Sequence, residues 1–304
     1  MELRTLKYFL TVAREENITH AADVLHITQP TLSRQMAALE EELGVTLFER
    51  GSHRITLTDS GMLLRRRAQE IVELTCKTVE EMAHADMDVA GNISIGAGET
   101  ANMEYLAQGI AAFQKRYPDV TFSVYTAIAD DVKEKLEQGF LDFGLVADPV
   151  DISTYHFVQL PKRDGWCLFM RRDDPLAKLP CIHPKDLSGQ DIIIPMRPSV
   201  RNDVENWLGP YAGTIRIRGH VNLSVHNMGY LVRAGVGKVL TFMLETVPDE
   251  FHLCPLEPDM KDSGFFVWRK NQFVAKPVHL FQDFFKDYIA GLSADTNGET
   301  EKKD

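Results

Sequence analysis

The stretch that decides the fold is ITHAADVLHITQPTLSRQM, residues 18–36. Its first part carries apolar residues at the spacing i, i+3, i+4 and i+7, which is one face of a short helix: Ile18, Ala21, Ala22 and Leu25. After a break at residues 26–27, a second helical face follows: Leu32, Met36, Leu39 and Leu43. Two short helices joined by a tight turn are typical of a helix-turn-helix, whose second helix enters the major groove of DNA.

The start of the second helix has a polar outer face suited to DNA. Thr28 is a natural N-cap, and Pro30 stands in the first turn, where a missing N–H has no cost. Free backbone N–H groups there can bind a phosphate, and the side chains of Gln29, Ser33 and Arg34 can reach bases or phosphates. The alternative is an ordinary capped surface helix. The predicted DNA contacts on this helix are Thr28, Gln29, Pro30, Thr31, Ser33 and Arg34.

A second basic element follows at residues 49–58, ERGSHRITLT. A Gly-Ser tip between two short extended runs predicts a β-hairpin wing, which would lay cations on phosphates or in the minor groove. The alternative is a solvated loop. The predicted DNA contacts on the wing are Arg50, His53 and Arg54.

The order of these parts resembles the LysR-type transcriptional regulators along nearly the whole chain. The resemblance is carried by residues 28–35 (TQPTLSRQ), 39–44 (LEEELG), 47–50 (LFER) and 57–61 (LTDSG). It implies an N-terminal α winged helix-turn-helix (1–58), a long linker helix that dimerises (59–89) and a two-lobed α/β effector domain resembling periplasmic binding proteins (90–292). It also implies double-stranded DNA and a small-molecule effector as partners, with RNA polymerase as a further one.

Length and composition agree with this organisation. A chain of 304 residues is long enough for two or three domains, and it has no run of 18 apolar residues that would span a membrane. The N-terminus lacks the features of a signal peptide, so we expect a cytoplasmic protein with no membrane partner. The net charge of −11 argues against a general nucleic-acid binder. We therefore expect local phosphate contacts, with affinity gained from two or more DNA-binding heads bound at once.

The predicted linker helix starts at Thr58-Asp59 and has no Gly or Pro from residue 62 to about residue 87. One side of it recurs at roughly heptad spacing, which favours a coiled-coil seam between two subunits. The alternative is that this side packs on the protein's own wing domain. We expect the protein to form a homodimer or a homotetramer, and of the two we favour the homotetramer. The predicted seam is Leu64, Ala68, Ile71, Thr75 and Met82.

Beyond residue 90, short apolar runs alternate with helical patterns, which indicates an α/β domain. The resemblance implies a first lobe of about 90–160 and 267–292 and a second lobe of about 161–266. Ligands of such domains lie beyond the carboxyl ends of the strands. Four loops there carry hydroxyls, free N–H groups and arginines, which favour a small anion. The predicted effector contacts are Gly98, Glu99, Thr100, Thr126, Ala127, Ile128, Pro195, Arg197, Ser199, Ser224 and His226.

The sequence departs from the family pattern in the second of these loops. Thr126-Ala127 stands where many members carry Glu-Gly, and Ala129 replaces a common hydroxyl. Both changes predict a less polar cleft and an effector unlike the common small aromatic and dicarboxylic acids.

The remaining features favour no other chemistry. Four scattered cysteines lack metal-ligand spacing, and Cys167 and Cys181 stand where some relatives carry a redox pair, so a redox-gated or constitutive regulator is the competing hypothesis. We find no phosphate loop, nucleophile elbow or metal cluster, so we expect neither an enzyme nor a cofactor or metal; a helix-turn-helix fused to an α/β enzyme is the remote alternative. The polar tail, residues 293–304, is predicted to be disordered.

Overall fold

The computed structural model describes residues 1–50, 55–83, 89–222, 224–243, 245–270 and 274–300. They form two compact units, Met1–Ala83 and His84–Asp304, each with its own hydrophobic core. The described part of the chain has no helix that is both long enough and apolar enough to cross a membrane.

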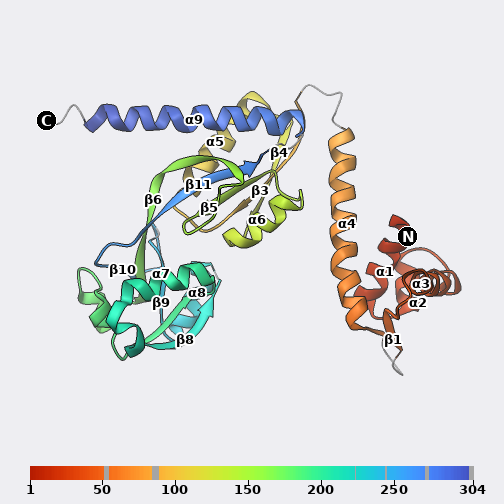
Figure 1. The fold of residues 1–304 in the computed structure, drawn as a ribbon, viewed down its shortest axis with the longest axis horizontal. Helices are drawn as coiled ribbons and strands as arrows, with labels where there is room; N and C mark the ends of the chain where they lie inside the picture. The colour runs from red at the N-terminus through yellow and green to blue at the C-terminus, as the bar shows by residue number, and fades with distance from the viewer. Residues whose placement is uncertain (51–54, 84–88, 223, 244, 271–273, 301–304) are drawn as a thin grey trace. The chain divides into compact units, whose positions relative to one another are not determined.

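The first unit is a winged helix-turn-helix followed by a long helix (Figure 1). The Asn17 side chain accepts hydrogen bonds from the backbone N–H groups of Thr19 and His20 and so starts the second helix. The elements are α1 (Leu3–Glu15), α2 (Ile18–Val24), α3 (Gln29–Leu43), β1 (Phe48–Arg50), β2 (Ile55–Leu57) and α4 (Asp59–Ala83).

The apolar faces predicted for the two short helices meet in the core of this unit. Ala21 and Leu32 are fully buried there, and Met36 and Leu39 are nearly so. β1 and β2 pair antiparallel, which confirms the hairpin, while its tip at residues 51–54 lies outside the described residues. The side chain of Thr58 caps α4, since its hydroxyl accepts a hydrogen bond from the N–H of Gly61 at 3.0 Å.

The second unit is built on one mixed sheet with the strand order β4-β3-β5-β11-β6-β9-β7-β8, and β10 pairs with β6. The first lobe carries β3 (Gly91–Ala97), α5 (Met103–Arg116), β4 (Val120–Thr126), α6 (Ala129–Glu137), β5 (Phe143–Ala147) and α9 (Lys276–Thr300). The second lobe carries β7 (Asp191–Pro195), α7 (Pro198–Leu208), β8 (Arg216–Val221), α8 (Val225–Arg233), β9 (Lys238–Phe242) and β10 (Phe251–Pro255). Its short 3₁₀ helices are η1 (Pro175–Lys178), η2 (Pro184–Leu187) and η3 (Gly209–Thr214).

Two long strands, β6 (Tyr155–Arg171) and β11 (Lys261–Arg269), run between the lobes, as Figure 1 shows. They pair antiparallel with Asp164 opposite Asp262. β5 pairs antiparallel with β11, and β9 and β10 pair antiparallel with β6. Among the other pairs, β3 lies parallel to β4 and β5, and β7 lies parallel to β8 and β9. Because all these strands end toward the gap between the lobes, the loops that follow them meet there.

The secondary structure departs from the prediction at the C-terminus. α9 packs Phe281 and Phe285 into the core of the first lobe and continues as a helix to Thr300, where a disordered tail was predicted from Ser293. A helix already nucleated by packing extends at low cost, since each further residue adds a hydrogen bond. Residues 301–304 lie outside the described part.

Candidate DNA-binding surface and ligand pocket

The polar face of α3 points away from the core of the first unit. Leu32 and Met36 hold the other face inside, so Gln29, Pro30 and Arg34 are exposed. Gln29 donates to the Ser33 hydroxyl at 3.1 Å, and Arg34 donates to its own helix backbone at Pro30 O, 3.3 Å. These side chains have only local partners, which makes them available to a partner outside the chain.

Thr28 has the N-cap position predicted for it, but it caps in a different way. Its hydroxyl lies 2.8 Å from the hydroxyl of Thr31 and makes no hydrogen bond to the helix backbone. The backbone carbonyl of Thr28, and not its side chain, accepts the N–H groups of Thr31 and Leu32. Because Pro30 has no N–H, the N–H of Gln29 is the one left in this turn for a phosphate. Of the wing residues, Arg50 ends β1, and His53 and Arg54 lie outside the described residues.

The predicted seam on α4 is divided between two environments. Ala68 is fully buried in the core of the first unit, and the partly buried Leu64 packs against the same core, so both positions contact the protein's own domain. The first turns of α4 cover one side of the hydrophobic core of the winged helix-turn-helix and shield it from water. Ile71 is 40 % exposed, and Met82, further along α4, is 65 % exposed. Thr75 donates its hydroxyl to the backbone at Ile71 O.

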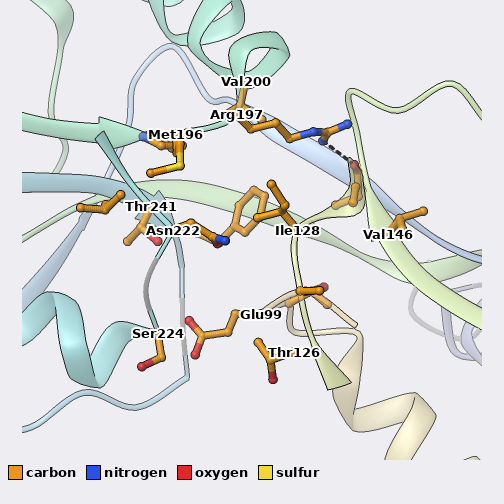
Figure 2. Close-up of a pocket in the computed structure, with 18 of the residues that line it drawn as sticks. Glu99, Thr126, Ile128, Val146, Met196, Arg197, Val200, Asn222, Ser224 and Thr241 are labelled. Carbon is orange, nitrogen blue, oxygen red and sulfur yellow. Dashed lines mark hydrogen bonds between the residues drawn. The ribbon is translucent and has the colours of Figure 1, made fainter. Parts of the chain in front are cut away.

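A pocket of about 250 Å³ lies between the two lobes of the second unit, at the carboxyl ends of the strands. Nine of the predicted effector contacts line it: Gly98, Glu99, Thr100, Thr126, Ala127, Ile128, Pro195, Arg197 and Ser224. Figure 2 shows Glu99, Thr126 and Ser224 together at one end and Arg197 at the other.

Two predicted contacts are not part of the lining. Ser199 lies in the first turn of α7, one residue past Pro198, and it is Val200 that faces the pocket. His226 is exposed on α8, where its ring meets that of Tyr230 at 5.3 Å, while Met228 lines the pocket. In both helices a residue on the neighbouring face was taken for the inward one.

The sequence prediction also missed part of the lining. Thr241 and Phe242 end β9, and the same rule about carboxyl ends of parallel strands would have found them. Trp166 lies in an apolar run that looked like plain core, so no signal marked it. The other lining residues that were not predicted are Ala129, Leu145, Val146, Ala147, Asp148, Met196, Val200, Val221, Asn222, Met228 and Leu240.

Arg197 does not offer its charge to the pocket. Its Nε pairs with the carboxylate of Asp130 at 3.2 Å, and its terminal nitrogens donate to the carbonyls of Ala147 and Pro149 at 3.4 and 2.5 Å. The residue is 9 % exposed. Because all three partners belong to the first lobe, this second-lobe arginine connects the two lobes. The sequence predicted an anionic ligand partly from this arginine, but its positive charge is already paired within the protein.

Glu99 makes the second tie between the lobes. Its carboxylate accepts a hydrogen bond from the N–H of Val225 at 3.1 Å, at the first turn of α8. This position is favourable for a negative charge because helix N-termini carry partial positive charge. Burial raises the pKa of Glu99, and the Val225 hydrogen bond acts in the opposite direction.

Thr100 has its hydroxyl engaged on the side of the connecting strands. The hydroxyl donates to the buried carboxylate of Asp164 at 2.5 Å, and the N–H of Ala101 donates to the same carboxylate at 2.8 Å. Nearby, the indole N–H of Trp166 donates to Asp262 at 3.2 Å. The pocket wall is therefore coupled by hydrogen bonds to the two strands on which the lobes would pivot.

Two of the four cysteines are buried in the second lobe, while Cys76 is exposed on α4 and Cys181 is half-buried. Cys167 and Cys254 are fully buried, and burial raises the pKa of both thiols. Cys181 lies 3.8 Å from the ring of His183. In the part of the chain that the structure describes, no three His, Cys, Asp or Glu side chains are grouped to hold a metal ion.

Comparison with known proteins gives two family models. The model for bacterial regulatory helix-turn-helix proteins of the lysR family matches residues 3–62, and the model for the LysR substrate binding domain matches residues 88–290. The HTH-type transcriptional regulator BsdA of Bacillus subtilis (strain 168) is 28 % identical over 298 residues, covering 94 % of this chain and 100 % of its own.

Two further relatives bear on the fold and on DNA. The DNA-binding transcriptional dual regulator OxyR of Escherichia coli (strain K12) is 30 % identical over 196 residues, covering 64 % of this chain and 63 % of its own. The solved structure of full-length CbnR complexed with its target DNA superposes with a TM-score of 0.73 at 25 % identity, covering 95 % of this chain and 99 % of that one.

Proposed function

The chain belongs to the LysR family of DNA-binding transcriptional regulators, and from that membership we propose that a small molecule bound between its two lobes controls how paired DNA-binding heads hold DNA. The observation that carries the proposal is the inter-lobe pocket, which is lined from both lobes and bridged by Glu99 and Arg197. A ligand in such a pocket changes the relative stability of open and closed arrangements, and only a difference in affinity between them can shift the balance.

The DNA-reading part of the proposal rests on α3. Its exposed face carries Gln29 and Arg34, side chains that suit adenine and guanine edges. In its first turn Pro30 has no N–H, and Thr31 and Leu32 donate to the Thr28 carbonyl, which leaves the N–H of Gln29 for a phosphate. CbnR, at 25 % identity, is a relative whose printed title describes a complex with target DNA. We propose that this protein acts on double-stranded DNA in the cytoplasm, with RNA polymerase as a further partner.

The proposal requires at least two copies of the chain. The later part of α4 has exposed apolar side chains at helical spacing, Val79 (62 % exposed) and Met82 (65 % exposed). We propose a homodimer through this part of α4, and a homotetramer built from two such dimers. Because the chain is negatively charged, we expect one DNA-binding domain alone to bind DNA weakly, and two domains bound at once would raise the affinity.

We expect Arg34→Ala to weaken binding to the protein's selected site by roughly tenfold to a hundredfold, the range for one well-placed base contact. The measurement is a gel-shift titration at fixed salt, with DNA selected by this protein from a random pool. Arg14→Ala is the matched control, because Arg14 is an exposed arginine that pairs with its neighbour Glu15 on α1. Equal site affinity for Arg34→Ala and the control would refute the assignment of α3 as the reading helix.

The redox-gated alternative gains little from the thiols. A thiol reacts as a thiolate, and burial holds the pKa of Cys167 and Cys254 above the usual range. The fused-enzyme alternative gains nothing from the comparisons, since the relatives named above are all described as regulators.

A further inference from the structure

The charged groups around the inter-lobe pocket define which ligand it can hold. Of the described residues that line it, the charged ones are Glu99, Asp148 and Arg197. Arg197 is already matched by Asp130 and two backbone carbonyls. Two carboxylates therefore line the pocket, together with one arginine whose positive charge is already paired with Asp130 and two carbonyl groups.

An anionic ligand has no free positive partner among these groups. It could reach Arg197 only by displacing Asp130, and it could reach the first turn of α8 only by displacing Glu99, whose carboxylate already accepts the N–H of Val225. The first turns of α6 and α7 also line the pocket and have no side-chain cap, but an anion there would still share the pocket with two carboxylates, which repel it.

A cationic ligand meets the opposite conditions. The Glu99 carboxylate accepts one hydrogen bond, from Val225, and a carboxylate can accept about four. Glu99 is exposed in the pocket, so an ammonium group can approach its carboxylate directly, and the pairing would offset the partial desolvation that raises the pKa of Glu99. Thr126 and Ser224 lie beside Glu99 (Figure 2) and supply hydroxyls at the same end.

Apart from Thr100, Asn222 and Thr241, the rest of the lining is apolar. Trp166 and Phe242 meet edge to face with ring centroids 4.8 Å apart, and Ile128, Met196 and Met228 complete the wall. Methionines fit irregular shapes, and aromatic faces attract a nearby cation. The body of the ligand is therefore expected to be aliphatic or aromatic.

We propose that the inter-lobe pocket binds a small amine with an apolar body, its ammonium group on Glu99, and that it excludes carboxylates. This inference rests on the proposed function of the pocket and specifies its ligand class. It replaces the anionic effector expected from the arginines in the sequence.

The test uses the full-length protein and probes that share a carbon skeleton and differ in their polar end. One set is 2-phenylethylamine, 2-phenylethanol and phenylacetate; the indole and hexyl sets are built in the same way. Binding is measured by titration calorimetry and by the upward shift in Tm that a ligand of the folded state must cause. In at least one set we expect the amine to bind at least about tenfold more tightly than its alcohol and its acid.

Two variants separate the role of Glu99 from general effects on the fold. Glu99→Gln keeps an acceptor for Val225 and removes the charge, and it is expected to bring the amine to the affinity of the alcohol. Glu205→Gln is the matched control, because Glu205 is exposed on α7 outside the lining, and it is expected to change nothing.

Several outcomes would overturn the proposal. These are an acid that binds more tightly than its amine, an amine affinity that survives Glu99→Gln, or no amine that binds. An acid or alcohol that binds saturably and is excluded by the pocket-filling variant Val146→Trp would overturn the amine alone and leave the effector pocket standing. No binding by any probe class would count against both.

Discussion

Asp262 is the residue whose surroundings conflict most with its charge. It lies on β11 opposite Asp164 of β6, it is 8 % exposed, and Asp148 and Asp203 are also near enough to repel it. Burial, followed by these like charges, raises its pKa to about 6, although the Trp166 hydrogen bond acts in the opposite direction. β11, one of the two long strands between the lobes, therefore carries a carboxylate that destabilises the folded protein when it is ionised.

We expect Asp262→Asn to stabilise the protein at about pH 8 by roughly 1–2 kcal/mol, a full shift of two pKa units being discounted for partial solvent access. The folded state binds this proton more tightly than the unfolded state does, so stability falls as pH rises from about 4 to 6. Urea denaturation at about pH 8 and about pH 5 measures the difference. The gain of the variant is expected to shrink by about half at the lower pH.

The same experiment can contradict this account. The amide oxygen of the Asp262→Asn variant would still accept the Trp166 N–H, so the tryptophan fluorescence is expected to stay unchanged. A variant protein that is less stable than the native one at about pH 8 would show that the carboxylate is held by favourable partners.

At the scale of residues, the sequence predicted positions better than roles. Nine of eleven predicted pocket residues line the pocket, because loops after parallel strands must meet at one edge of the sheet. The role of Arg197 could not be predicted, because its partner Asp130 is 67 positions away and lies in the other lobe, so that only the tertiary structure brings them together. For Ser199 an error of one position, and for His226 an error of two positions, was enough to turn the side chain out of the pocket, where Val200 and Met228 lie instead.

At the scale of elements, α4 shows why a periodic stripe does not identify its own partner. Leu64 and Ala68 share the predicted stripe with Ile71 and Met82, and the sequence does not distinguish them. The winged helix-turn-helix covers Leu64 and Ala68, while Ile71 and Met82 are exposed further along the helix. The helical pattern was predictable, but the place where one packing partner ends was not, since it depends on the size of the head.

We expect the double variant Val79→Asp, Met82→Asp to weaken the dimer by at least about tenfold without unfolding the head, because a charge would be buried in a partner interface. Sedimentation velocity over a range of concentrations measures the mass. The control adds the same two charges at exposed positions off the stripe, Gln69→Asp and Cys76→Asp. If the stripe variant and the control gave the same mass, α4 would not be the dimer seam.

At the scale of the whole effector unit, two long strands and two polar ties govern the lobes. β6 and β11 connect the lobes, Arg197 ties the start of α7 to the first lobe, and Glu99 ties the first lobe to the start of α8. Alternating strands and helices predicted an α/β domain and the family resemblance implied two lobes, but no local pattern in the sequence predicts that they are tied. A ligand that enters the pocket must act on these ties to change the geometry of the unit.

Arg197→Met is expected to shift the effector unit toward open arrangements, because a buried guanidinium that bridges the lobes is replaced by a side chain that keeps the packing without the bonds. Asp130 is half exposed, so the effect is smaller than that of a fully buried pair, about 1–3 kcal/mol in the balance of states. Hydrogen exchange measures this shift directly: the N–H of Val225, which donates to Glu99, is expected to exchange roughly five- to a hundredfold faster.

Arg218→Met is the matched control, since Arg218 pairs with Asp191 inside the second lobe. If the rate at Val225 were equal in both variants, the apolar wall and not Arg197 would hold the lobes together. If it rose only in Arg197→Met and fell again with a bound amine, ligand and arginine would act on the same equilibrium.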